Sequence, residues 1–337
     1  MLVVPIVASL GFKIPKTSSR AITSPAGTAD RVEVLCPVNL SIEEMKEVVM
    51  KTNGCMVWGG ALRLAPLDDI IIRVEYPLSI DPFYMPSIMA KKAAVGATHV
   101  VLDIPVGRGG KVKTIGQGHA LARDFIELAN RLGMRLRCVL TYGEQPIGYG
   151  VGPALEAREA LMTLMGRGPR DLVDKAASVA GTLLEMVGVK NGKQTALEVL
   201  RSGKAERKFR EIVEAQGGDP GVKPGDIPVG EHKAVIKSTI KGSVLWINNG
   251  AIAQIARAAG APKDKGAGVL LNVKIGDLVR AGDVLMEIYA EKSYKLELAE
   301  KLVNELSPIG VGDPLKQMLV DVVPAEKPHA KWTIIER

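Results

Sequence analysis

The strongest constraint on the fold is the alternation of strand-like and helix-like segments in the first half of the chain. Residues 99–104 (HVVLDI) and 136–141 are short runs typical of buried strands, and residues 117–132 between them have helical spacing. Earlier in the chain we expect a helix at 42–53, a strand from Cys55 and a helix at 86–95. The first of these helices begins with a Ser41–Glu44 capping box and is expected to stop at Gly54. This alternation predicts an α/β fold with a mixed, mostly parallel sheet flanked by helices.

A glycine- and proline-rich segment at 217–226 separates a mainly helical stretch from one in which strands dominate. Before it, we expect three helical stretches between Pro153 and Gln216. After it, the expected strands are 234–237, 244–247, 269–273 and 284–289, and the expected helices are 251–259 and 293–306. We therefore predict an α/β catalytic domain over residues 1–227 and a C-terminal α+β, barrel-sandwich-like domain over residues 228–337.

Composition narrows the possible partners. The net charge is +7, but the basic residues are dispersed and aromatic residues make up only 4% of the chain, so we expect small anionic substrates and no nucleic acid. No apolar run approaches the ~20 residues of a membrane-spanning helix, and the apolar opening of the chain reads as a buried helix. Three widely spaced cysteines favour reduced thiols and a cytoplasmic protein. The four histidines show no metal-ligand spacing.

The segment most suited to binding is KTSSRAITSPAGTAD, residues 16–30. It combines several hydroxyls with Arg20 and with a Gly27-Thr28 pair, and Thr28 stands where a helix N-cap is expected. Hydroxyls and free amides at a helix start can bind phosphate, and an arginine can add a bidentate contact. On this pattern alone, a polar loop before a capped helix explains the segment equally well.

Two further segments carry candidate polar residues. Asp81 precedes Pro82 just before the expected helix at 86–95, where Ser87 and Lys91 share one face. Lys111 lies in the glycine-rich stretch that follows the strand at 99–104, a position where α/β folds bind ligands. Taken alone, Asp-Pro is a common turn signal and Lys111 reads as a solvated side chain.

In order along the chain, these motifs resemble the AMP phosphorylase branch of the thymidine phosphorylase family. The resemblance implies that Asp81 donates a proton to the leaving base. It implies that the residues binding the nucleotide are Ser19, Arg20, Ala21, Ile22, Thr23, Ser24, Thr28, Ser87 and Lys111. It also implies that residues 66–96 are what remains of a small helical domain, and that the family's Gly-Gly-x-x-Gly phosphate loop lies upstream of Met1.

The implied activity is that of a pentosyltransferase. AMP would react with phosphate to give the free base and ribose 1,5-bisphosphate, without a cofactor, in a homodimer or larger homo-oligomer. CMP and UMP are further candidate substrates. Two alternatives stay open. One is a thymidine or pyrimidine-nucleoside phosphorylase, although those enzymes have a more glycine-rich version of residues 19–24. The other is an inactive truncated form that serves as a nucleotide-binding or assembly module.

Two further resemblances concern a metal and a carrier role. Ile147, Gly150 and Glu159 match potassium-binding positions of pyrimidine-nucleoside phosphorylases, but the other half of that site is expected upstream, so we predict no metal. Residues 260–291 resemble biotinyl and lipoyl domains, yet they lack the hairpin lysine that carries the prosthetic group. A carrier function is therefore not expected.

Overall fold

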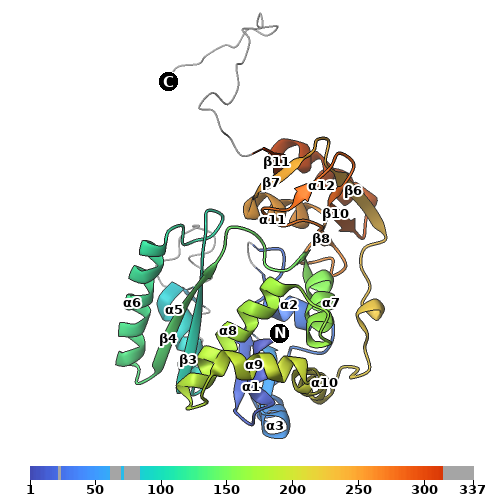
Figure 1. The fold of residues 1–337 in the computed structure, drawn as a ribbon. Coiled ribbons are helices and arrows are strands. Elements are labelled where there is room, and N and C mark those ends of the chain that lie inside the picture. Colours follow the sequence, from blue (N-terminus) through green and yellow to red (C-terminus); the bar gives the residue numbers. More distant parts are fainter. Residues whose placement is uncertain (22–23, 61–69, 72–83, 314–337) are drawn as a thin grey trace, which may run out of the picture.

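The computed structural model describes residues 1–21, 24–60, 70–71 and 84–313. The chain forms an α/β unit, in the lower part of Figure 1, and a strand-rich C-terminal unit in the upper part, in orange and red. Three of the predicted site residues, Ile22, Thr23 and Asp81, lie outside the described residues, as does part of the predicted remnant at 66–96.

Parallel strand pairs form the centre of the α/β unit, as predicted. β1 (Ile14–Ser18) pairs with β2 (Gly54–Trp58), and β3 (His99–Val106) pairs with β4 (Arg135–Tyr142). Among the described residues these are two separate ladders. The helices of this unit are α1 (Val3–Ala8), α2 (Thr28–Val32), α3 (Ile42–Thr52), α5 (Tyr84–Ala94), α6 (Ile115–Arg131), α7 (Pro153–Leu164), α8 (Arg170–Met186), α9 (Gly192–Arg201) and α10 (Lys204–Ala215).

The predicted capping box starts α3. The Glu44 amide donates to Ser41 Oγ at 3.2 Å, and the Ser41 amide donates to Glu44 Oε2 at 2.7 Å. The helix ends one residue earlier than predicted, at Asn53 rather than Gly54, because Asn53 adopts the left-handed conformation with φ 64°. Asparagine tolerates that conformation better than other non-glycine residues, so it can end a helix in place of glycine.

The segment from Pro153 to Gln216 contains four helices, α7 to α10, and not the three predicted. Gly203 separates α9 from α10 with a φ of +70°, a conformation that favours glycine and ends the helical hydrogen bonding. These helices share one apolar core with α1, whose Ile6 is fully buried. The buried helix predicted for the opening residues 1–16 is therefore confirmed in its first half only, because α1 ends at Ala8 and residues 14–16 belong to β1.

The C-terminal unit has the predicted α+β character. Its elements are strands β6 (His232–Lys237), β7 (Gly242–Ile247), β8 (Gly268–Leu271), β9 (Leu278–Val279), β10 (Val284–Ala290) and β11 (Ile309–Gly312), and helices α11 (Asn249–Ala258) and α12 (Ser293–Leu306). The 3₁₀ turn η1 (Pro224–Asp226) precedes them and packs against α7 of the α/β unit. The strands form two antiparallel sheets, ordered β5-β8-β10-β6 and β11-β7-β9. β5 (Gly150–Val151) joins this unit although it precedes the linker by more than sixty residues.

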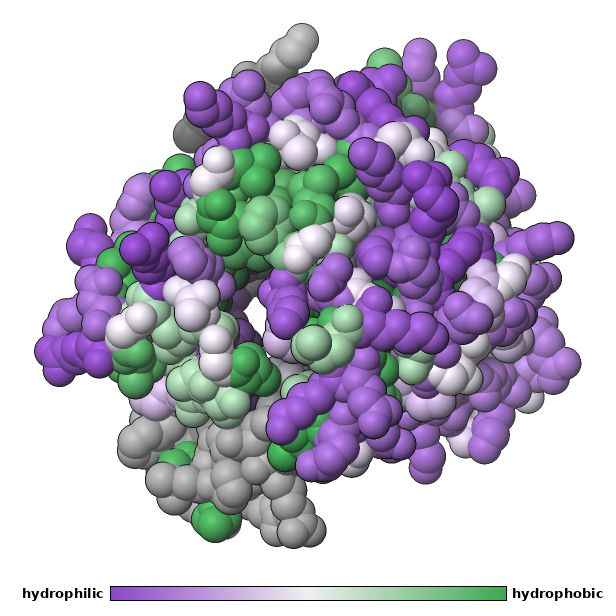
Figure 2. Space-filling view, turned by 90° about the horizontal axis from the view of Figure 1, so that it is seen from below, coloured by the Kyte–Doolittle hydropathy of each residue, from purple (hydrophilic) through white to green (hydrophobic). Residues whose placement is uncertain are grey.

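One face of the molecule carries gathered hydrophobic side chains. Seen from below the orientation of Figure 1, they lie in patches beside a hollow, and much of the remaining described surface in this view is hydrophilic (Figure 2). No helix in the described part of the chain is both long enough and apolar enough to cross a bilayer.

Candidate functional site

The candidate binding segment leaves the carboxyl end of β1. This strand lies in parallel beside β2, and ligands of α/β proteins bind beyond the carboxyl ends of such strands. Ser18 ends β1 and Ser19 follows it with an exposed side chain. The buried side chain of Gln216 holds β2 in position through Met56, a residue of that strand. It accepts a hydrogen bond from the Met56 amide at 2.8 Å and donates one to the Met56 carbonyl at 3.0 Å.

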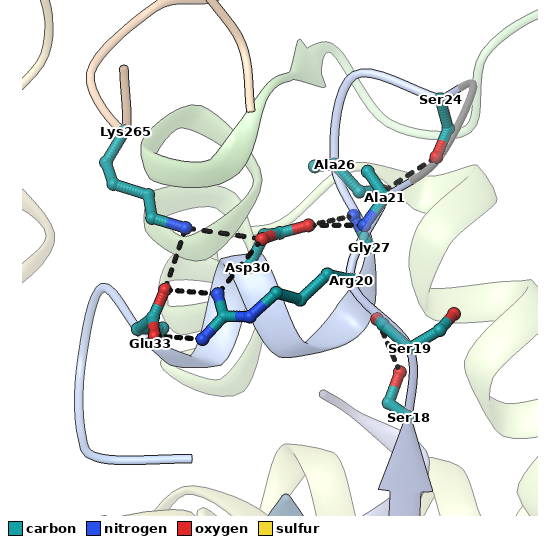
Figure 3. Close-up of polar contacts among 10 residues, drawn as sticks. All are labelled: Ser18, Ser19, Arg20, Ala21, Ser24, Ala26, Gly27, Asp30, Glu33 and Lys265. Carbon is teal, nitrogen blue, oxygen red and sulfur yellow. Dashed lines mark hydrogen bonds and ion pairs between the residues drawn. The ribbon is translucent and has the colours of Figure 1, made fainter. Parts of the chain in front are cut away.

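Asp30, on α2, closes the loop formed by residues 21–27. Its Oδ2 accepts hydrogen bonds from the Ala21 amide at 2.7 Å and from the Gly27 amide at 2.9 Å, at the two ends of the loop (Figure 3). The side chain of Asp30 is only 4% exposed, so these bonds are shielded from water. Asp30 therefore fixes the backbone at Ala21 and at Gly27, the two ends of the segment that includes the predicted ligand Ser24.

Gly27 is needed where this loop closes. A Cβ placed on Gly27 would lie 2.5 Å from the Ser19 carbonyl oxygen, closer than any side chain allows. Gly27 is also the N-cap of α2, and Thr28 is the first helical residue, so the prediction that Thr28 is the cap is wrong. The Gly27 amide donates to the carboxylate of Asp30, three residues later, as in a capping box. This three-residue spacing is the sequence signal that could have identified Asp30.

Arg20 pairs with two carboxylates on α2 and at its end. Its Nη1 and Nη2 donate to the two oxygens of Glu33 at 2.6 and 2.5 Å, and Nη1 also lies 3.4 Å from Asp30 Oδ1. The guanidinium stacks 4.8 Å from the centre of the Trp58 ring. Such a bidentate pair is geometrically specific. It raises the pKa of Arg20 and, chiefly through the hydrogen bonds from Arg20, lowers the pKa of Glu33 to about 2.

A second cation reaches the same carboxylates from the C-terminal unit. Lys265 Nζ lies 2.8 Å from Glu33 Oε2 and 3.3 Å from Asp30 Oδ1. Figure 3 shows Lys265 and Arg20 on either side of the two acids. We call Arg20, Asp30, Glu33 and Lys265 the four-charge cluster; its two positive and two negative side chains balance.

The low pKa of Glu33 predicts a specific acid sensitivity. An unfolded glutamate titrates near pH ~4.3, so Glu33 stabilises the fold fully above that pH, and the stabilisation is lost as the pH falls through about 2. The loss is at most ~3 kcal/mol. In urea unfolding at pH values from about 5 to about 2, we expect the stability difference between the wild type and Glu33→Gln to shrink steadily. A difference that stays constant would contradict this assignment, and Glu300→Gln, at an exposed position on α12, is the control.

The remaining predicted ligands lie on three elements. In the loop, Ser24 is exposed and its Oγ donates to the Ala26 carbonyl at 3.4 Å. On α5, Ser87 accepts a hydrogen bond from Lys91 Nζ at 3.4 Å, which confirms that these two residues share a face.

The neighbouring Lys92 has a pKa lowered to about 8, first by burial and then by the positive charges of Lys16, on β1, and Lys91. Cationic groups from α5 and β1 therefore lie close enough to repel one another.

Lys111 is exposed in the glycine-rich turn after β3. The turn is closed by the Gly107 amide, which donates to the Val112 carbonyl at 3.0 Å, and Gly107 packs directly on Gly143. Asn249, at the start of α11, donates to the Gly143 carbonyl at 2.8 Å and contacts Gly109. The C-terminal unit thus contacts this turn as well as the four-charge cluster.

The three positions matched to a potassium site line a separate cavity of about 390 Å³, together with Arg31 and Lys175. Burial raises the pKa of Glu159 to about 7, although its Oε1 accepts from the Tyr149 amide at 2.7 Å.

The ammonium of Lys274, from the C-terminal unit, binds backbone carbonyls of the loop at residues 146–148, beside this cavity. It donates to the Pro146 carbonyl at 2.8 Å and to the Gly148 carbonyl, and it pairs with Asp171 at 2.8 Å. Within the described residues, no three His, Cys, Asp or Glu side chains are grouped as metal ligands. That the protein holds no metal remains a prediction.

Comparison with known proteins identifies the family. The model of the glycosyl transferase family α/β domain matches residues 2–206, which is more than half of the chain. The chain belongs to this family. A second model, of the pyrimidine nucleoside phosphorylase C-terminal domain, matches residues 244–310.

Curated relatives of this glycosyl transferase are similar along nearly the whole chain. An "AMP phosphorylase" of Thermofilum pendens is 59% identical and covers 100% of the chain, and one of Pyrococcus horikoshii is 54% identical over 96%. An "AMP phosphorylase" of Methanosarcina barkeri is 55% identical over 92%. The chain itself spans 66%, 65% and 63% of the length of these three relatives. The resemblance inferred from the motifs is confirmed.

A solved structure supports the fold. Anthranilate phosphoribosyltransferase from Thermus thermophilus matches with a TM-score of 0.51 at 20% identity, over 64% of this chain and 72% of that one.

Proposed function

We propose that this chain catalyses the phosphorolysis of AMP. The observation that carries the proposal is the Ser19–Ser24 segment, which leaves the carboxyl end of β1 and is closed by Asp30, in a chain 53–59% identical to relatives named AMP phosphorylase. The exposed Ser19 and Ser24 hydroxyls and the neighbouring Arg20 guanidinium suit a ligand that carries a phosphorylated sugar.

In the proposed reaction, an oxygen of inorganic phosphate attacks C1′ of AMP as the C1′–N9 bond breaks. The products are adenine and ribose 1,5-bisphosphate. Purines leave far more easily when N7 is protonated, and we assign that proton to the carboxylic acid of Asp81. Inorganic phosphate is a co-substrate, and no cofactor is required. The nucleotide contacts are assigned to Ser19, Arg20, Ala21, Ile22, Thr23, Ser24, Thr28, Ser87 and Lys111.

Release of free base from AMP, CMP, UMP and thymidine, each with and without phosphate, tests the substrate assignment. We expect phosphate-dependent release that is fastest with AMP. Release from thymidine alone would overturn the AMP assignment in favour of a pyrimidine-nucleoside phosphorylase. Absence of release from all four would leave a nucleotide-binding module, which calorimetric titration with AMP would then detect.

We also propose that the protein works in the cytoplasm as a homodimer or larger homo-oligomer. The hydrophobic patches of Figure 2 support assembly, because a monomer's surface seldom gathers such side chains without a partner. Burial raises the pKa of the Cys36 and Cys55 thiols to about 12, which suits residues kept as unreactive thiols. Light scattering after size-exclusion chromatography should give at least twice the mass of one chain; a mass equal to one chain at micromolar concentration would contradict the assembly.

A further inference from the structure

Lys265 lies in the loop that connects α11 to β8, far along the sequence from the candidate binding loop. Its backbone is held firmly, since its carbonyl accepts from the Ala154 amide at the start of α7 at 3.0 Å. The flanking Asp264 pairs with Lys295 at 2.6 Å, and the flanking Gly266 amide donates to Glu291 at 2.8 Å. The C-terminal unit therefore presents the Lys265 ammonium from a fixed support.

The ammonium bridges the two acids that shape the binding loop. It contacts Oδ1 of Asp30 while Oδ2 of the same carboxylate holds the Ala21 and Gly27 amides. It also contacts Oε2 of Glu33, the oxygen that accepts from Arg20 Nη1. Each carboxylate thus binds both Lys265 and the binding segment: Asp30 through different oxygens, and Glu33 through an Oε2 that Lys265 shares with Arg20.

The charges show what the loop would lose without this lysine. Arg20 alone would face two carboxylates, one of them buried, and the four-charge cluster would carry a net charge of −1 beside the loop. A buried carboxylate that loses a cationic partner is destabilised, and a negative cluster repels a phosphate-bearing ligand.

We propose that Lys265 is a positioning residue of the nucleotide site: by bridging Asp30 and Glu33 from the C-terminal unit, it holds Arg20 and the Ala21 and Gly27 amides in the geometry that receives the phosphorylated nucleotide. The inference rests on the proposed function for the identity of the ligand, but the bridge itself exists without any ligand. The C-terminal unit is then part of the binding site through this contact.

The first test measures ligand binding. Lys265→Gln should weaken AMP binding by at least about tenfold in calorimetric titration, raise the KM for AMP more than it lowers kcat, and change adenosine binding much less. Lys265→Arg should restore most of the affinity, because the guanidinium can still bridge both acids. Lys263→Gln, at an exposed position in the same loop, is the matched control and should bind AMP as the wild type does. Equal AMP binding by Lys265→Gln and Lys263→Gln would overturn the proposal.

The second test needs no ligand and separates this proposal from the proposed function. Hydrogen exchange followed by NMR should show the Ala21 and Gly27 amides exchanging at least about tenfold faster in Lys265→Gln than in Lys263→Gln. Faster exchange in a protein that does not bind AMP would support the bridge and overturn the function. Unchanged exchange at both amides would overturn the bridge, whatever the protein binds.

Discussion

Replacing Asp81 with asparagine is expected to lower kcat for AMP phosphorolysis by about 10²- to 10⁴-fold, the usual contribution of a general acid. Asparagine keeps the size and polarity of the side chain but has no acidic proton to give to N7 of adenine. The AMP dissociation constant, measured by calorimetric titration, should therefore change by no more than about threefold. Asp81 lies outside the described residues, and its role is proposed from the Ser79–Pro82 segment.

The matched control for this substitution is Asp124→Asn, which makes the same chemical change at an exposed position on α6. It should leave kcat and AMP binding unaltered. If Asp81→Asn instead reduced AMP affinity as much as it reduced turnover, Asp81 would only position the substrate, and the proton would have to come from another group.

Asp30→Asn should be the most damaging change in the binding segment itself. An amide has one oxygen and one NH₂ group, so it cannot replace both carboxylate oxygens. With NH₂ at the Oδ2 position, it faces the Ala21 and Gly27 amides; with NH₂ at the Oδ1 position, it faces Arg20 and Lys265. The first orientation leaves the Ala21 and Gly27 amides without an acceptor, and the second turns an NH₂ group toward two cations, which then keep only Glu33.

The expected cost is about 2–4 kcal/mol of unfolding free energy, from lost hydrogen bonds to a charged group and unbalanced cations. AMP binding should weaken by at least about tenfold, because Ala21 and Gly27 are then less firmly held before the ligand arrives. Urea unfolding and calorimetric titration measure the two effects, again with Asp124→Asn as the control. A folded Asp30→Asn protein that binds AMP as tightly as the wild type would separate the 21–27 loop from nucleotide recognition.

Sequence patterns predicted the elements whose formation depends on neighbouring residues. The α3 capping box, the β3–α6–β4 alternation and the strands around β8 and β10 are determined by local spacing of apolar and capping residues, and the structure has them within a few residues. β1 was not predicted, because its sequence Ile14-Pro15-Lys16-Thr17-Ser18 has a proline and little apolar character. It becomes a strand through parallel pairing with the buried β2.

The candidate site shows the same division. The local motif identified Arg20 and the hydroxyl-rich loop, but the residues that hold them were not identified. Glu33 is thirteen residues from Arg20, and Lys265 is 235 residues from Asp30. No periodicity links side chains at such separations, since they meet only after the C-terminal unit packs beside α2. Family resemblance did not supply them either, because it transfers the residues that touch substrate and omits those that support them.

The most direct test of the proposed activity follows phosphorus during the reaction. In ³¹P NMR of the purified chain with AMP and phosphate, we expect the AMP and inorganic phosphate signals to decline in equal amounts. Two new signals of equal intensity should grow, from the two phosphates of ribose 1,5-bisphosphate, and adenine should be released in the same quantity. Adenine released with ribose 5-phosphate at constant inorganic phosphate would contradict phosphorolysis, and AMP left unconsumed in the presence of phosphate would contradict catalysis by this chain.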